Sequence, residues 1–346
     1  MNLQHLLGIE FPLIQAPMAG VQDNRLALAV CAAGGLGSLP CALLSLDALR
    51  AELNSLRAGT DRPYNLNFFC HTPPPADAAR EAGWRVALAP YYQELGLDPA
   101  AIPQGPGRAP FSPEAAALLS EFQPRVVSFH FGLPSVELLA QVRGWGAKVI
   151  ASATTLAEGL WLQERGVDAV IAQGLEAGGH RGHFLSHDLT EQAGTFALLP
   201  QLVRALHLPV IAAGGIADAR GVAAAMALGA AGVQVGTAYL LCREATTSAV
   251  HRAVLQSPAA AHTALTTLFT GRPARGVINR LMRELGPLNA AAPAFPLATG
   301  AIAPLRTRAE SQGSGDFSPL WCGQNASGCR EIGAADLTRQ LAQGFD

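Results

Sequence analysis

The stretch Asp168–Gly182, DAVIAQGLEAGGHRG, indicates how the chain folds, because an apolar run ends abruptly at an amide side chain and a glycine-rich loop follows. Residues 169–172 are apolar without alternation, which is typical of a parallel strand covered on both faces. The glycines of the loop allow a ligand to approach the main chain closely. The stretch therefore predicts a buried strand that delivers Gln173 and His180 to a site, although a connecting turn with a surface histidine has the same composition.

Segments on both sides of this stretch repeat the alternation of a short apolar strand and an amphipathic helix. The predicted strands are residues 12–18, 35–40, 64–70, 124–132, 148–154, 168–173, 208–216 and 232–240. Eight such units predict an α/β fold of the (β/α)8 TIM barrel type. Doubly wound sheets also alternate strand and helix.

The placement of polar residues favours the barrel over the doubly wound sheet. Polar residues or glycine stand at or near the carboxyl ends of seven predicted strands, namely Gln15, Asn67, His130, Ser152, Gln173, Gly214 and Gln234. In TIM barrels the carboxyl ends of the strands carry the chemistry. The pattern therefore predicts one site assembled from many strand ends.

We expect residues 1–346 to form a single domain with two additions to the barrel. Residues 71–113 form a proline-rich insertion with a helical patch around 77–95, and a long irregular connection of this kind is usually functional. Residues from about 250 to 346 form a helical extension, helical near 251–283 and ending in a glycine- and serine-rich tail. Both additions are expected to cover the mouth of the barrel.

Composition limits the classes of function. The net charge is −2 and charged residues make up 14% of the chain, which gives no clustered basic face for nucleic acid. No apolar run is long enough to span a bilayer, and no secretory signal is evident, so a cytoplasmic protein without membrane contact is expected. The sequence leaves monomer and homodimer both open.

Cysteine and histidine spacing argues against a metal site. The six cysteines lack the close pairs of tetrahedral zinc sites and are expected to be free thiols. His183 and His187 have no acidic partner fixed nearby, so no metal is predicted.

Two successive glycine-rich strand ends predict a phosphate site. AAGGI at 212–216 and QVGTAY at 234–239 can both present main-chain amides to an anion, at the place where barrels usually hold a phosphate. Thr237 adds a hydroxyl donor. Glycine-rich turns also occur without ligands, but the absence of G-x-G-x-x-G after the first strand argues against a separate Rossmann module.

Seven segments in this order resemble the nitronate monooxygenase family, formerly called 2-nitropropane dioxygenases. They are QAPMAG from Gln15, NFFCHTPPP from Asn67, SFHFGLP from Ser128, AQGLEAGGHRG from Ala172, PVIAAGGI from Pro209, GVQVGTAYL from Gly232 and GRPARG from Gly271. SFHFGLP and GGHRG look most like the class I bacterial enzymes. The related quinone reductases would be expected to have a histidine where this sequence has Ser152.

The resemblance implies an FMN cofactor and assigns its contacts. The residues expected to face or hydrogen-bond the flavin ring are Ala16, Pro17, Met18, Asn67, Gln173 and Gly178. Those expected to hold the ribityl phosphate are Gly214, Gly215, Gln234, Gly236 and Thr237. Residue chemistry agrees, since neutral amides suit the mixed donors and acceptors of an isoalloxazine ring and glycine amides suit a phosphate.

The implied reaction is the oxidation of an alkyl nitronate, such as propionate 3-nitronate, by O2 to a carbonyl compound and nitrite, through a flavin semiquinone. His180 is expected to be the base or anion-binding residue, because its loop is freest to reach the substrate, and His130 is the second candidate. Two other classes remain open. One is an FMN-dependent NAD(P)H:quinone or enoyl-thioester reductase, and the other is a colourless barrel that binds a sugar phosphate.

Overall fold

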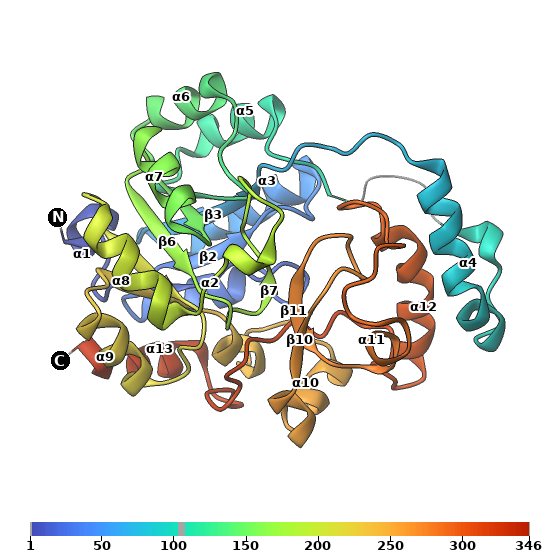
Figure 1. Cartoon of the computed structure of the whole chain (residues 1–346). Coiled ribbons are helices and arrows are strands. Elements are labelled where there is room, and N and C mark those ends of the chain that lie inside the picture. Colours follow the sequence, from blue (N-terminus) through green and yellow to red (C-terminus); the bar gives the residue numbers. More distant parts are fainter. Residues whose placement is uncertain (1, 103–107, 346) are drawn as a thin grey trace.

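The computed structural model describes residues 2–102 and 108–345 and shows eight parallel strands in one sheet (Figure 1). The sheet has the order β1-β9-β8-β6-β5-β4-β3-β2, and a bridge between Ile14 and Leu36 joins its first and last strands. The strands are β1 (Leu13–Gln15), β2 (Gly37–Pro40), β3 (Tyr64–Phe69), β4 (Val126–His130), β5 (Lys148–Ala153), β6 (Ala169–Gln173), β8 (Val210–Ala213) and β9 (Gly232–Val235). The predicted barrel is confirmed.

The last two barrel strands are shorter than predicted. β8 ends at Ala213 because Gly214 and Gly215 adopt φ values of 110° and 76°, in the left-handed region that glycine favours. β9 ends at Val235, and Thr237–Leu241 form a 3-10 helix where the prediction extended the strand. Both strands therefore stop beside the glycines that were expected to bind phosphate.

Helices between the strands cover the outside of the barrel, as Figure 1 shows. They are α2 (Asn24–Ala32), α3 (Leu46–Gly59), α5 (Pro113–Phe122), α6 (Val136–Gly144), α7 (Leu156–Glu164), α8 (Thr195–Ala205) and α9 (Ala219–Ala227). Ser45 and Ser112 accept main-chain N–H groups as the N-caps of α3 and α5. The N-cap of α2 is Asp23, whose carboxylate accepts the Arg25 N–H.

The barrel is closed at its amino end by α1 (Leu3–Leu7). Leu3 and Leu7 are buried against residues from several strands, among them Ile150 and Ile211. This packing fills the barrel centre with branched side chains, so the open space lies at the opposite end of the strands.

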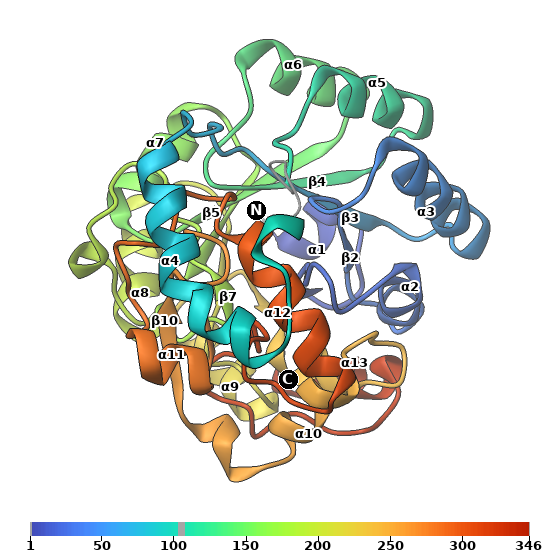
Figure 2. The ribbon, with the colours of Figure 1, turned by 90° about the vertical axis from the view of Figure 1, so that its right-hand side faces the viewer.

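A second apolar core lies beyond the carboxyl ends of the strands. It joins α4 (Ala78–Glu94), the expected helical patch of the insertion, to α11 (Arg280–Leu285) and α12 (Thr299–Ser311). Tyr92 donates its hydroxyl proton to the Ala301 carbonyl at 2.7 Å. Figure 2 shows α4 and α12 side by side in front of the barrel. The insertion and the C-terminal segment therefore form one cap.

The segment after β9 contains strands as well as helices. Its elements are α10 (Ala249–Leu255), β10 (Thr263–Thr266), β11 (Ala274–Val277), α11 and α12. The expectation of helix near 251–283 is wrong for residues 263–277. There, β10 and β11 pair in an antiparallel sheet with β7 (Gly179–His180), a partner that lies far away in the sequence.

The chain ends on the side of the barrel. α13 (Ala334–Ala342) packs against α2 and α9, the position of the eighth barrel helix. The short 3-10 helices are Pro99–Ala101, Leu189–Glu191, Thr237–Leu241, Pro258–Ala261 and Gln343–Phe345. Across the two described ranges, no helix is both long enough and apolar enough to cross a membrane.

Candidate functional site

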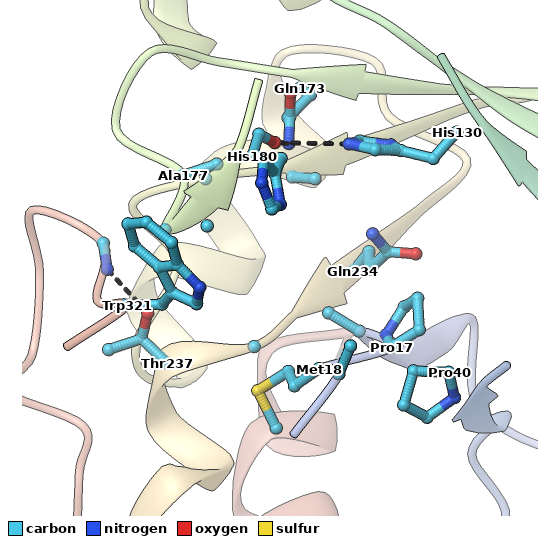
Figure 3. A pocket seen from close by; sticks show the side chains of 18 of the residues that line it. Pro17, Met18, Pro40, His130, Gln173, Ala177, His180, Gln234, Thr237 and Trp321 are labelled. Atoms are coloured by element: carbon cyan, nitrogen blue, oxygen red, sulfur yellow. Dashed lines mark hydrogen bonds between the residues drawn. The ribbon is translucent and has the colours of Figure 1, made fainter. Parts of the chain in front are cut away.

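A cavity lies between the carboxyl ends of the barrel strands and the cap (Figure 3). Its volume is about 1370 Å³, including the part open to solvent. All thirteen predicted site residues line it, namely Ala16, Pro17, Met18, Asn67, His130, Gln173, Gly178, His180, Gly214, Gly215, Gln234, Gly236 and Thr237. The structure thus brings together residues from almost the whole length of the barrel sequence.

Other residues of the cavity wall were missed by the sequence analysis. Arg108 comes from the insertion, and Trp321, Gly323 and Asn325 come from the segment after α12. The sequence analysis expected the insertion and the C-terminal extension to cover the mouth of the barrel, but it did not identify which of their residues would line the cavity. These residues form hydrogen bonds with residues far away in the sequence, since Arg108 bonds to Thr299, Gly323 to Thr237 and Asn325 to Gly215. Spacing within the sequence could therefore not identify them.

One end of the cavity is a wall of main-chain amides and hydroxyls. Gly178 lies so close to the segment after α12 that a Cβ atom at this position would be 2.6 Å from the Gly323 nitrogen. The Gly323 N–H donates to Thr237 Oγ1 at 2.9 Å, so the Thr237 hydroxyl keeps its own proton to donate elsewhere. Asn325 donates to the Gly215 carbonyl at 3.0 Å. This end of the cavity therefore has the Thr237 hydroxyl as a hydrogen-bond donor and glycines without side chains around it.

The side-chain amides of the cavity are partly engaged by the protein itself. Asn67 Nδ2 donates to Ser128 Oγ at 2.9 Å. Gln173 Nε2 donates to the His180 carbonyl at 3.0 Å, while its Oε1 accepts the Gly182 N–H at 2.7 Å. Gln173 therefore orders the central loop, and only one of its N–H groups remains for a ligand. Gln234 Oε1 differs, because it is buried with no hydrogen-bond partner among the described residues.

His130 has both ring nitrogens engaged. Nε2 lies 3.2 Å from the His180 carbonyl oxygen, which can only accept, so Nε2 carries the proton. Nδ1 then accepts from the Ser152 hydroxyl at 3.1 Å. Burial lowers the pKa of His130 to about 3, so the ring is neutral at pH 7. With both nitrogens occupied, His130 is poorly placed to remove a proton from a substrate.

His180 has one ring nitrogen free. Thr270 Oγ1 lies 3.0 Å from His180 Nε2 and 3.3 Å from the Arg272 carbonyl oxygen. When the Thr270 hydroxyl donates its one proton to that carbonyl, Oγ1 accepts the proton on Nε2. Nδ1 therefore carries a lone pair and has no hydrogen-bond partner in the part of the chain that the structure describes. Figure 3 shows the ring directed into the cavity beside Trp321, with 5.7 Å between the ring centres.

The charge state of His180 suits a base. Burial, with the positive charge of Arg108 as the next cause, lowers the pKa of His180 well below its ordinary value. Phe69, Phe131 and Phe295 pack around the ring at centre distances of 6.0, 5.9 and 5.3 Å. The imidazole is therefore neutral at pH 7 in a largely apolar setting.

The loop that carries His180 is held firmly, contrary to the expectation of a free loop. His180 and Gly179 pair with Ala274 and Arg275 of β11. Arg181 is fully buried and donates to the carbonyls of Gly174 and Gln173, at 2.7 Å each, and to Gln192 Oε1 at 2.7 Å. These contacts fix the position of the His180 ring without help from a ligand.

A buried carboxylate holds the far end of the same loop. Glu158 on α7 accepts the Phe184 N–H at 2.6 Å and the Thr154 N–H at 2.6 Å.

The rings of His183 and His187 lie edge to face, with 5.7 Å between their centres. Among the described residues, no group of three or more His, Cys, Asp or Glu side chains could hold a metal ion. All six cysteines are free thiols.

Comparison with known proteins identifies relatives along the full chain. The sequence model of the family described as "Nitronate monooxygenase" matches residues 1–344. The nitronate monooxygenase of Paraburkholderia phytofirmans is 43% identical over 338 residues, which cover 97% of this chain and 92% of that protein. The enzyme of the same name from Pseudomonas aeruginosa is 42% identical over 340 residues, which cover 98% of this chain and 97% of that protein.

A solved structure agrees with these relatives. The structure of nitroalkane oxidase from Streptomyces ansochromogenes superposes with a TM-score of 0.88 at 38% identity and covers 99% of this chain and 97% of that chain. The similarity extends over the barrel and the cap together, so it includes every element that lines the cavity.

Proposed function

The chain belongs to the nitronate monooxygenase family, and on that premise we propose that it is an FMN-dependent enzyme that oxidises alkyl nitronates with O2 to a carbonyl compound and nitrite. Propionate 3-nitronate is the substrate we choose to test. The observation that carries the proposal is the cavity at the strand ends, which contains Gln234 Oε1 without a partner among the described residues and is lined at its far end by glycines.

The cavity residues fit FMN at three points. Gln234 Oε1 is a buried acceptor without a partner, which suits a ribityl hydroxyl or a flavin N–H. The glycines at the ends of β8 and β9 leave room for a phosphate to approach their amides, and Thr237 has a free hydroxyl proton for it. Gln173 retains one amide hydrogen for the ring, whereas both hydrogen bonds of Asn67 Nδ2 go to Ser128. When bound, FMN would accept electrons from the nitronate and pass them to O2.

His180 supplies a proton acceptor for neutral nitroalkanes. The lone pair on Nδ1 can take the proton from the carbon next to the nitro group, while Nε2–H stays bonded to Thr270. A nitronate arrives without that proton, so this step matters only for the neutral form. His130 does not take part in this proton transfer, because its Nε2–H donates to the His180 carbonyl. It is therefore a residue that positions His180.

The aromatic side chains around His180 keep water away from the reacting atoms. Phe69, Phe131 and Phe295 contact one another at ring-centre distances between 4.7 and 6.2 Å. A dry site strengthens the attraction between a bound anion and nearby positive charge, because little solvent screens it. Arg108 lies in the wall of this site.

The test is direct. The purified protein should be yellow, and anaerobic propionate 3-nitronate should change its flavin absorbance within seconds. Air should then restore the oxidised spectrum and release nitrite. A colourless, folded protein would refute the cofactor. Rapid reduction of the flavin by NADH or NADPH, with no response to nitronate, would instead favour the reductase.

A further inference from the structure

Arg108 occupies an unusual position for a charged side chain. It lines the cavity from the insertion and donates from one Nη1 to Thr299 Oγ1 at 2.9 Å. Its guanidinium carbon lies 5.8 Å from the centre of the Phe295 ring, so an aromatic face covers part of the group. No other hydrogen bond from its side chain to the described residues is present, which leaves most of its five N–H donors free.

No described side chain neutralises the positive charge of Arg108. No carboxylate in residues 2–102 or 108–345 forms an ion pair with it, and residues 103–107 contain no acidic side chain. Nearby Arg306, by contrast, is paired with Glu310 at 2.8 Å. Burial lowers the pKa of Arg108 to about 10, so the guanidinium remains charged at pH 7.

An unpaired, partly buried cation is costly unless something compensates it. Arg181 and Arg275, which are more deeply buried but do not line the cavity, donate to main-chain carbonyls. Arg108 instead lines the same cavity as His180, and after burial it is the largest cause of the lowered pKa of that histidine. A bound anion would supply the missing partner.

We propose that Arg108 is the residue that binds an oxyanion of the substrate through its guanidinium fork. The inference rests on the proposed function and deepens it, because it names the specificity-determining residue of the same cavity. Nitronate and carboxylate groups both present two oxygens in one plane, which the fork can meet with two parallel hydrogen bonds. A substrate such as propionate 3-nitronate carries both groups, whereas ethyl nitronate carries only the first.

Steady-state kinetics with these two substrates test the inference. Arg108→Gln should lower kcat/KM about 10- to 100-fold, mainly through KM, which is the range for losing hydrogen bonds from a charged group. Arg306→Gln is the matched control, because it removes a neighbouring positive charge that does not line the cavity, and it should change kcat/KM by less than about twofold.

The two substrates identify which oxyanion Arg108 binds. Equal losses in the Arg108→Gln variant on both substrates would assign Arg108 to the nitronate group. A loss confined to propionate 3-nitronate would assign it to the carboxylate and explain a preference for dianionic substrates. A variant indistinguishable from Arg306→Gln on both substrates would overturn the inference.

A binding measurement separates this inference from the proposed reaction. Calorimetry with propionate and with nitrate, neither of which is turned over, should show at least one anion binding to the wild type and about tenfold more weakly to Arg108→Gln. Arg108→Lys keeps the charge without the fork and should recover part of that affinity, which also covers the case that the glutamine variant fails to fold. Anion binding without nitronate turnover would refute only the proposed function, whereas equal affinity in all variants, or none in the wild type, would refute the role of Arg108.

Discussion

Replacing Thr270 by valine should separate the two substrate forms of the enzyme. Thr270 is 2% exposed, and its Oγ1 accepts the His180 Nε2–H at 3.0 Å. Valine has nearly the same shape but no hydroxyl, so the packing is kept while the hydrogen bonds with His180 Nε2 and with the Arg272 carbonyl are both lost. The Nε2–H would then be buried without a partner, and the alternative tautomer, with the proton on Nδ1, would gain population.

The magnitude follows from the cost of an unsatisfied buried donor. That cost is about 1–3 kcal/mol, which corresponds to a change of roughly 5- to 150-fold in the ratio of the two tautomers. Only the tautomer with a free Nδ1 can accept a proton from the substrate. The kcat/KM for a neutral nitroalkane should therefore fall by up to about this factor, the largest loss occurring if the two tautomers are similar in energy, while that for its nitronate should change by less than about twofold.

The assay compares nitroethane with ethyl nitronate in wild type, Thr270→Val and Thr270→Ser. Serine keeps the hydroxyl and should retain most of the activity on both forms. Nitrogen-15 chemical shifts of the His180 ring report the tautomer independently of turnover, and they should differ only in the valine variant. Equal losses on both substrates, or an unchanged tautomer together with reduced activity, would refute the assignment of Thr270 as the residue that positions the base.

Three further predictions concern the cofactor, the base and acid stability. A Cβ atom at Gly236 would lie 3.2 Å from the Ala16 Cβ, so Gly236→Val should fold but lose FMN, and full flavin occupancy in the purified variant would contradict the phosphate site. His180→Asn should retain most nitronate activity and lose at least about 100-fold on neutral nitroalkanes, and equal kcat/KM losses on both forms would remove His180 from proton transfer. Burial lowers the pKa of His251 to about 4, so its neutral form contributes stability above pH 6.5 that is lost as the pH falls towards 4. Chemical denaturation at several pH values in this window gives the free energy of unfolding as a function of pH. For His251→Gln the slope of this dependence should be smaller by the equivalent of about one proton, and an unchanged slope would count against a neutral buried His251.

The sequence determined the barrel and which strand-end residues line the cavity. An apolar run that ends in a polar residue or a glycine is a local signal, because the residues of a buried strand are apolar on both faces and the chemistry begins where the strand stops. In a closed parallel barrel all strands end at the same rim. Knowing that Asn67, Gln173 and Gly236 stand at strand ends was therefore enough to predict that they share one cavity. Gln15, also predicted at a strand end, is instead fully buried and bonded to Gln22 and the Ser38 N–H outside that cavity.

The tertiary structure decided what the side chains in that cavity can do. The loop of His180 reads as flexible in the sequence, but pairing with β11 and the buried Arg181 hold it in place. The sequence placed His180 before His130 only because its loop looked free, whereas the partners of the ring nitrogens decide their roles. Those partners, Thr270 and Ser152, lie 90 and 22 residues away. Arg108 reaches the wall only because the insertion and α12 form one cap. Such contacts depend on packing between segments remote in the chain, so no local pattern of residues encodes them.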